Sequence, residues 1–144
     1  MKELRIVIVD DSELIREYLR QVLAEIQGCN VVGMAEDGNK ALTVIRSLGP
    51  DLTILDISMP HRGGIDVLRE IRKEDSDMIV IMFTADPSIV LERVCLREGA
   101  NYYVSKTQAR ELLDICKDLV QSCCPRGRDD RLTGSWPPAT CAPD

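Results

Sequence analysis

Four short apolar runs in the sequence each end at residues that can take part in phosphate chemistry: Asp10 and Asp11, Asp56, Thr84, and Lys106. A carboxylate can act as a nucleophile toward phosphorus. An ammonium group and a hydroxyl group can bind the oxygens of a phosphoryl group. If these side chains meet in space, together they hold the groups that phosphoryl transfer needs.

The apolar runs themselves predict how these side chains are positioned. They cover residues 4–9, 52–55, 78–83 and 102–105, and a further apolar segment at 31–35 is also typical of a strand. Short apolar runs separated by helical patterns favour buried parallel strands. The carboxyl ends of such strands form the ligand crevice of an open sheet. We therefore expect three carboxylates, one hydroxyl and one ammonium at the same edge.

Apolar residues at steps of three and four predict five helices, over residues 14–26, 41–48, 65–71, 89–95 and 112–120. Asp11 or Ser12 can cap the first helix, and Gly28 suits its exit. Asp86 resembles an N-cap that is followed by Pro87 at the first position of the fourth helix. Five strands alternating with five helices predict a doubly wound α/β sheet with right-handed crossovers.

Length, composition and charge limit the classes of function. A chain of 144 residues favours one domain. The net charge of −6 argues against a nucleic-acid partner, and no apolar run approaches the length of a membrane span. The six cysteines form no Cys-x-x-Cys motif, so we expect reduced thiols in the cytoplasm. The composition turns polar near Pro125, which predicts a folded domain at 1–122 and a disordered tail at 123–144.

The predicted cluster of charges favours a bound cation. Two like charges 4 Å apart repel by roughly 4 kcal/mol at an effective dielectric near 20. Lys106 can offset only one of the three carboxylates of Asp10, Asp11 and Asp56. Oxygen ligands that retain waters suit Mg²⁺ or Mn²⁺ rather than Zn²⁺. Without a cation, we expect at least one carboxyl group to keep a proton with a raised pKa.

Several motifs in order make the sequence resemble the receiver domain of two-component response regulators, of which the chemotaxis protein CheY is a stand-alone example. The resemblance covers about residues 3–121 and rests on Val-Asp-Asp-Ser at 9–12, Pro-Asp-Leu-x-x-x-Asp at 50–56 and Asp-x-x-Met-Pro-x-x-x-Gly at 56–64; Thr84-Ala85, Glu98-Gly99-Ala100 and Lys106 add to it. It implies a five-stranded flavodoxin-like (βα)5 sheet with strand order 2-1-3-4-5.

The resemblance also implies a phosphoacceptor and a metal site. Asp56 matches the residue that accepts a phosphoryl group from a phosphohistidine. Asp11 matches a direct Mg²⁺ ligand, together with Asp56 and the backbone carbonyl of Ser58. Asp10 would hold the metal mostly through water, and Lys106 would pair with the phosphoryl oxygens.

Two further positions match the switch of the family. Thr84 would hydrogen-bond to the phosphoryl group, and Tyr103 would turn inward once Thr84 has moved. The face made by the fourth helix, fifth strand and fifth helix would then bind a protein. The resemblance implies a sensor histidine kinase or phosphotransfer protein as phosphodonor and a downstream protein of unknown identity. We expect neither nucleic acid nor membrane as partner. The chain would be a monomer or a phosphorylation-dependent dimer.

No output domain is evident, because the tail is too short and polar to be a DNA-binding module. We therefore expect a stand-alone receiver that is not an enzyme, beyond catalysing its own phosphorylation and dephosphorylation. The family usually has a proline after the strand-ending lysine, whereas Thr107 stands here. A cis bond before a residue other than proline costs about 2.5–4 kcal/mol, so we expect a trans bond and a slightly different loop.

Two other functions deserve comparison with a receiver. Phosphatases of the haloacid dehalogenase type need a second aspartate two residues after the nucleophile on the first strand. Here Asp10 and Asp11 are adjacent, and Ser58 lies two residues after Asp56, so that reading fits poorly. The stronger alternative is a receiver-like module that binds its partner without being phosphorylated, and the missing proline leaves it open.

Overall fold

All five predicted strands lie in one parallel sheet in the computed structural model, which describes residues 3–85 and 88–122. The strands are β1 (Leu4–Val9), β2 (Cys29–Ala35), β3 (Leu52–Leu55), β4 (Ile79–Thr84) and β5 (Tyr102–Ser105). Their order is β2-β1-β3-β4-β5. This confirms both the doubly wound α/β class and the strand order that the resemblance implied.

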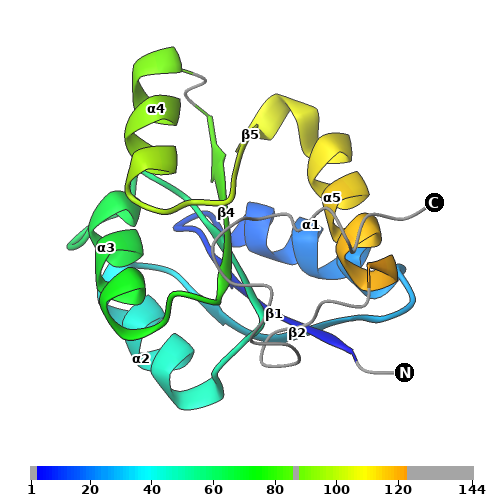
Figure 1. The fold of residues 1–144 in the computed structure, drawn as a ribbon. Coiled ribbons are helices and arrows are strands. Elements are labelled where there is room, and N and C mark those ends of the chain that lie inside the picture. Colours follow the sequence, from blue (N-terminus) through cyan, green and yellow to red (C-terminus); the bar gives the residue numbers. More distant parts are fainter. Residues whose placement is uncertain (1–2, 86–87, 123–144) are drawn as a thin grey trace.

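Helices cover both faces of the sheet. They are α1 (Glu13–Ala24), α2 (Gly38–Leu48), α3 (Gly64–Glu74), α4 (Ile89–Arg97) and α5 (Ala109–Gln121). Helices α1 and α5 lie on one face, and α2, α3 and α4 lie on the other (Figure 1). Each helix follows a strand, so every strand ends at the edge where the loops into the helices begin.

Strands β3 and β4 are buried along their whole length because both of their faces are covered. Ile6 and Ile8 of β1 pack into the cluster beneath α1 and α5. Val7 and Val9, the alternate residues, pack into the cluster beneath α2, α3 and α4. The sheet is therefore held between two apolar layers, and the strand ends are fixed relative to one another.

The first helix begins as predicted and ends earlier. Ser12 is its N-cap, and the Ser12 hydroxyl accepts a hydrogen bond from the Ile15 amide (3.3 Å). Helix α1 ends at Ala24 rather than near Ile26, and Gly28 then takes a left-handed φ of 98°. Glycine adopts this conformation without steric cost, which lets the chain reverse direction into β2.

The start predicted for the fourth helix is wrong. Ser88 is the N-cap of α4, and its hydroxyl accepts a hydrogen bond from the Leu91 amide (3.3 Å). The helix begins at Ile89, so Pro87 is not its first residue. Asp86 and Pro87 themselves lie outside the described residues. Serine and aspartate cap helices equally well, so the segment Asp-Pro-Ser offered two possible starts.

One element was not predicted at all. A single 3-10 turn, η1 (Lys106–Gln108), follows β5 directly and precedes α5. The described chain ends at Ser122, so the tail predicted at 123–144 lies outside the described residues. Among the helices that the structure describes, none is long and apolar enough to span a membrane.

Candidate functional site

The first two acidic residues of the site follow β1 directly. The Asp10 amide donates a hydrogen bond to the Ala35 carbonyl at the end of β2 (3.1 Å). The Asp10 side chain is buried, and its Oδ1 accepts a hydrogen bond from the Ser12 amide (2.9 Å). The next residue, Asp11, is exposed. The Asp10 carboxylate is therefore buried at the end of β1, and the Asp11 carboxylate lies beside it at the surface.

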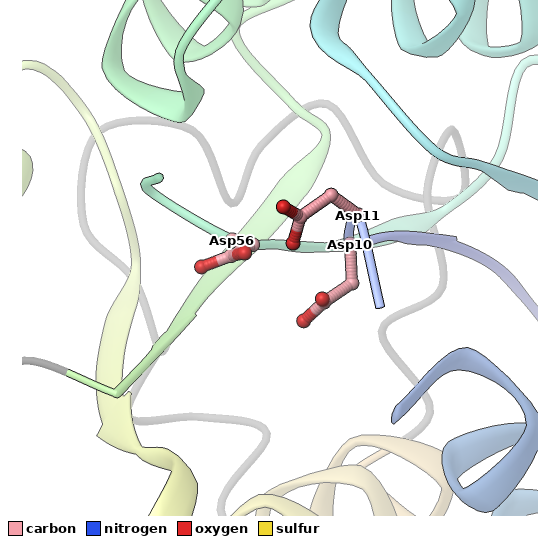
Figure 2. A group of neighbouring side chains, drawn as sticks. All are labelled: Asp10, Asp11 and Asp56. Carbon is pink, nitrogen blue, oxygen red and sulfur yellow. The ribbon is translucent and has the colours of Figure 1, made fainter. Parts of the chain in front are cut away.

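The third carboxylate comes from β3. The Asp56 amide donates to the Val9 carbonyl (2.9 Å), which ties the residue to the end of β1, and only 4% of Asp56 is exposed. Oxygen atoms of Asp10, Asp11 and Asp56 lie within 4.8 Å of one another. Figure 2 shows the three side chains side by side where the two strands end. The structure thus brings the three predicted carboxylates together.

Lys106 completes the cluster from the end of β5. Its Nζ lies 2.7 Å from Asp10 Oδ2 and 3.4 Å from Asp56 Oδ2. The lysine side chain is mostly buried, with 17% exposed. The predicted ammonium therefore lies at the same strand edge as the carboxylates, and its shorter contact is with Asp10.

The residues around Lys106 explain how it reaches the carboxylates without the usual proline. The Thr107 amide donates to the Ser105 hydroxyl (3.2 Å), and the hydroxyls of Ser105 and Thr107 lie 2.8 Å apart. A proline at position 107 could not make the first contact, because it has no amide hydrogen. The hydroxyl pair instead closes the turn that begins at Lys106.

The electrostatics of the site agree with its geometry. Burial raises the pKa of the Asp56 carboxyl to about 6, and the nearby Asp10 charge adds to this, while Lys106 acts in the opposite direction. Burial disfavours the charged form of Lys106, but its contacts with Asp10 and Asp56 outweigh this and raise the lysine pKa. Lys106 therefore stays protonated, and Asp56 holds its proton well above the ordinary range of an aspartate.

The donor set fits a hard divalent cation. Three carboxylates offer oxygen ligands, and one ammonium leaves their charge only partly neutralised. Asp10 is engaged by Lys106 and by the Ser12 amide. This leaves the oxygens of Asp11 and Asp56 as the more available direct ligands. Ser58 is exposed in the segment between β3 and α3, and the ligand role of its carbonyl stays a prediction.

The two predicted switch residues lie on the neighbouring strands β4 and β5. Thr84 is buried at the end of β4 and is paired in register with Ser105 of β5. Tyr103 is paired with Met82 and is partly buried against the cluster beneath α2, α3 and α4. Thr84 thus lies at the strand edge that carries the carboxylates. The inward movement of Tyr103 stays a prediction.

Comparison with known proteins decides the family. The family model described as the response regulator receiver domain matches residues 6–117. The chain belongs to this family. It is therefore a receiver domain of the kind used in phosphorylation-based two-component signalling.

Relatives of this receiver include longer proteins. The protein-glutamate methylesterase/protein-glutamine glutaminase of Trichodesmium erythraeum is 39% identical over 108 residues, which cover 74% of this chain and 31% of that protein. Response regulator UvrY of Escherichia coli K12 is 35% identical over 106 residues, covering 74% of this chain and 49% of UvrY. The chain thus spans about a third to a half of the length of these curated relatives.

A solved structure with the same fold is named as a complex with BeF3 and Mg²⁺. It is the CheX-CheY-BeF3-Mg²⁺ complex of Borrelia burgdorferi, with a TM-score of 0.72 and 27% identity over 79% of this receiver and 90% of that chain. The likeness extends over nearly the whole of the solved chain.

Two contacts near the site were not predicted. One is the hydroxyl pair of Ser105 and Thr107, for which the Ser-x-Thr spacing at a strand end was an available signal. The other is Arg16, whose guanidinium donates to the Asp10 carbonyl (2.6 Å). Its position in the first turn of α1 gives no sequence signal, because an arginine there is ordinarily solvated.

Proposed function

We propose that this receiver accepts a phosphoryl group onto Asp56 from a phosphohistidine, with Mg²⁺ or Mn²⁺ bound, and then switches a protein-binding face. The donor would be a sensor histidine kinase or a phosphotransfer protein. The observation that carries the proposal is the cluster itself: carboxylates from β1 and β3 and the ammonium of Lys106 meet within a few ångströms. An isolated aspartate or lysine at a strand end would not support this proposal, because such residues are common in turns and on surfaces.

The chemistry assigned to each residue follows from its place in the cluster. An oxygen of the Asp56 carboxylate forms the new bond to phosphorus while the bond from phosphorus to the histidine nitrogen breaks and imidazole leaves. Lys106, 3.4 Å from Asp56, neutralises charge on the transferring group. Asp11 and Asp56 would hold the cation, with Asp10 acting mostly through water. The cation supplies further charge neutralisation when bound.

The output is proposed to run through α4 and β5. Thr84 and Lys106 would approach the acyl phosphate, because it adds negative charge and acceptor oxygens at the strand edge. Helix α4 follows Thr84 and exposes three large apolar side chains, Ile89, Val90 and Leu96. Exposed apolar side chains that gather on one helix are typical of a protein-binding surface.

The remaining parts of the proposal concern the chain as a whole. We propose that it acts in the cytoplasm, as a monomer or a phosphorylation-dependent dimer, without nucleic acid or membrane as its partner. The acidic net charge of −6 supports the absence of a nucleic-acid partner. It would be no enzyme beyond catalysing its own phosphorylation and dephosphorylation.

A small phosphodonor tests the proposal without a cognate kinase. Full-length protein is incubated with acetyl phosphate and Mg²⁺, and intact mass is followed against a sample in EDTA. We expect a single phosphoryl adduct that needs Mg²⁺ and is absent from Asp56→Asn. Asp51→Asn is the matched control, because Asp51 is equally buried at the other end of β3 and should label normally.

Two results would count against the proposal. Labelling retained in Asp56→Asn would show that another residue accepts the phosphoryl group. No labelling of the wild type, by acetyl phosphate or by phosphorylated phosphotransfer proteins, would favour the alternative of a module that binds its partner without phosphorylation.

A further inference from the structure

The segment between β3 and α3, residues 56–63, carries the proposed phosphoacceptor Asp56 and the proposed metal ligand Ser58. Its two ends are joined closely, since the Gly64 amide donates to the Ile57 carbonyl (2.8 Å). Its outer bend is tight as well, because the Arg62 amide donates to the Pro60 carbonyl (2.7 Å) across His61, whose φ is 69°. Residues other than glycine rarely take a positive φ, so the contacts around the bend must hold His61 in this conformation.

The outer bend is held in place by the first turn of α2. Gly38, the first residue of α2, is buried against it, and a Cβ added there would lie 2.2 Å from the Arg62 carbonyl oxygen. Gly38 has no left-handed φ, so glycine is needed here for space rather than for conformation. A second contact lies beside it, where the Arg62 guanidinium donates to the Asn39 side-chain oxygen (3.2 Å).

Helix α2 is held in place by its cap and its core contacts, so it cannot shift to accommodate a larger residue at position 38. Asp37 caps it, with its side chain accepting from the Lys40 amide (2.8 Å) and its carbonyl accepting from the Ala41 amide (2.9 Å). Ala41, Leu42 and Ile45 are buried in the core beneath the helix. A methyl group at position 38 would therefore push the segment 56–63, not α2, by about 1 Å to restore a normal contact.

We infer that Gly38 is a positioning residue for the metal site: the first turn of α2 sets where the segment with Asp56 and Ser58 lies, and so sets the affinity for Mg²⁺. The inference rests on the proposed function, which supplies the metal. Mg²⁺ demands near-ideal geometry at short distances. A shift of about 1 Å in the ligand segment should therefore be costly, and lost support behind ligands typically lowers metal affinity by about 10- to 100-fold.

The test compares Gly38→Ala with Gly33→Ala. Gly33 lies in β2, and a Cβ there would meet the side chains of Leu48 and Val44 of α2 at 2.7 and 3.0 Å. Both variants therefore strain the packing of α2, but only Gly38→Ala presses on the segment 56–63. Mg²⁺ is titrated into full-length protein while amide chemical shifts are followed by NMR. Unfolding in EDTA is measured separately.

We expect Gly38→Ala to weaken Mg²⁺ binding at least tenfold and Gly33→Ala to change it less than threefold, whatever either does to stability. Equal affinities in wild type and Gly38→Ala, or equal losses in both variants, would overturn the inference. If wild type itself binds no Mg²⁺, the proposed function fails instead. The two failures are therefore distinguishable.

A second pair of variants, with smaller changes, tests the inference if Gly38→Ala does not fold. Asn39→Ala removes the exposed contact with Arg62. Arg46→Ala is the control, because it removes an exposed contact of the last turn of α2, an ion pair with Glu74 of α3. We expect Asn39→Ala to weaken Mg²⁺ binding about two- to fivefold and Arg46→Ala to leave it unchanged. An unchanged affinity in Asn39→Ala would contradict the inference.

Discussion

Replacing Asp56 with asparagine is expected to stabilise the metal-free protein at neutral pH, although it removes the proposed phosphoacceptor. In the folded chain, burial and the charge of Asp10 raise the pKa of the Asp56 carboxyl from its ordinary value of 3.8 to about 6. A carboxyl group with a raised pKa supports folding while it is protonated and opposes folding once it ionises. Asparagine resembles the protonated acid and does not ionise.

The size of the effect follows from the two pKa values. One pKa unit corresponds to about 1.4 kcal/mol, so ionised Asp56 makes the folded state less stable by about 3 kcal/mol. This loss develops as the pH rises from about 4 to about 6 and is complete above that range. Asp56→Asn should therefore gain up to about 3 kcal/mol of unfolding free energy at pH 7.5, and nothing below about pH 4.

Urea unfolding followed by circular dichroism, in EDTA and at several pH values between 4 and 8, measures this gain directly. Asp51→Asn is the control, because Asp51 is also buried but its Oδ2 accepts a hydrogen bond from the Arg5 amide (2.9 Å). It should gain no stability at any pH. A less stable Asp56→Asn protein at pH 7.5, or a gain that persists at pH 4, would refute the reasoning.

Three further predictions concern Lys106 and Thr107 at the site and Arg72 at the opposite edge of the sheet. Lys106→Met removes the ammonium that competes with a cation at Asp10, so Mg²⁺ should bind more tightly in a titration while labelling by acetyl phosphate slows. Thr107→Val removes a hydroxyl contact of about 0.5–1.5 kcal/mol and should slow labelling about two- to fivefold, and Thr107→Ser should restore the rate. Arg72→Ala leaves the Gly99 carbonyl without its guanidinium partner, so urea unfolding should show a loss of about 2–3 kcal/mol with unchanged Mg²⁺ affinity.

The strand ends could be predicted from sequence because several strands show the same pattern, an apolar run followed by a polar residue. Strands β1, β3, β4 and β5 are mainly apolar and each ends at or just before a polar residue, and the run at 79–84 is buried throughout. Parallel pairing then places those polar residues at one edge whatever the details of the loops. Asp10, Asp11, Asp56 and Lys106 accordingly lie together.

What sequence could not supply is which partner each side chain meets. The carboxylate nearest to Lys106 is Asp10, at 2.7 Å, rather than the proposed phosphoacceptor. This depends on the direction of η1, which the Ser105 and Thr107 hydroxyls fix through a local contact. The approach of Gly38 to Arg62 could not be predicted either, since it joins the first turn of α2 to the segment between β3 and α3, far away along the chain.

The hydrogen bonds at the other edge of the sheet limit how a phosphorylation signal can travel. At the strand starts, the Arg72 guanidinium of α3 donates to the Gly99 carbonyl (2.9 Å) and to the Asn101 side-chain oxygen (3.0 Å). That oxygen also accepts from the Val80 amide of β4 (2.8 Å). The end of α4 and the start of β5 are thereby tied to α3 and β4. A movement that begins at Thr84 should therefore turn α4 about its fixed C-terminal end, with the largest displacement at its first turn.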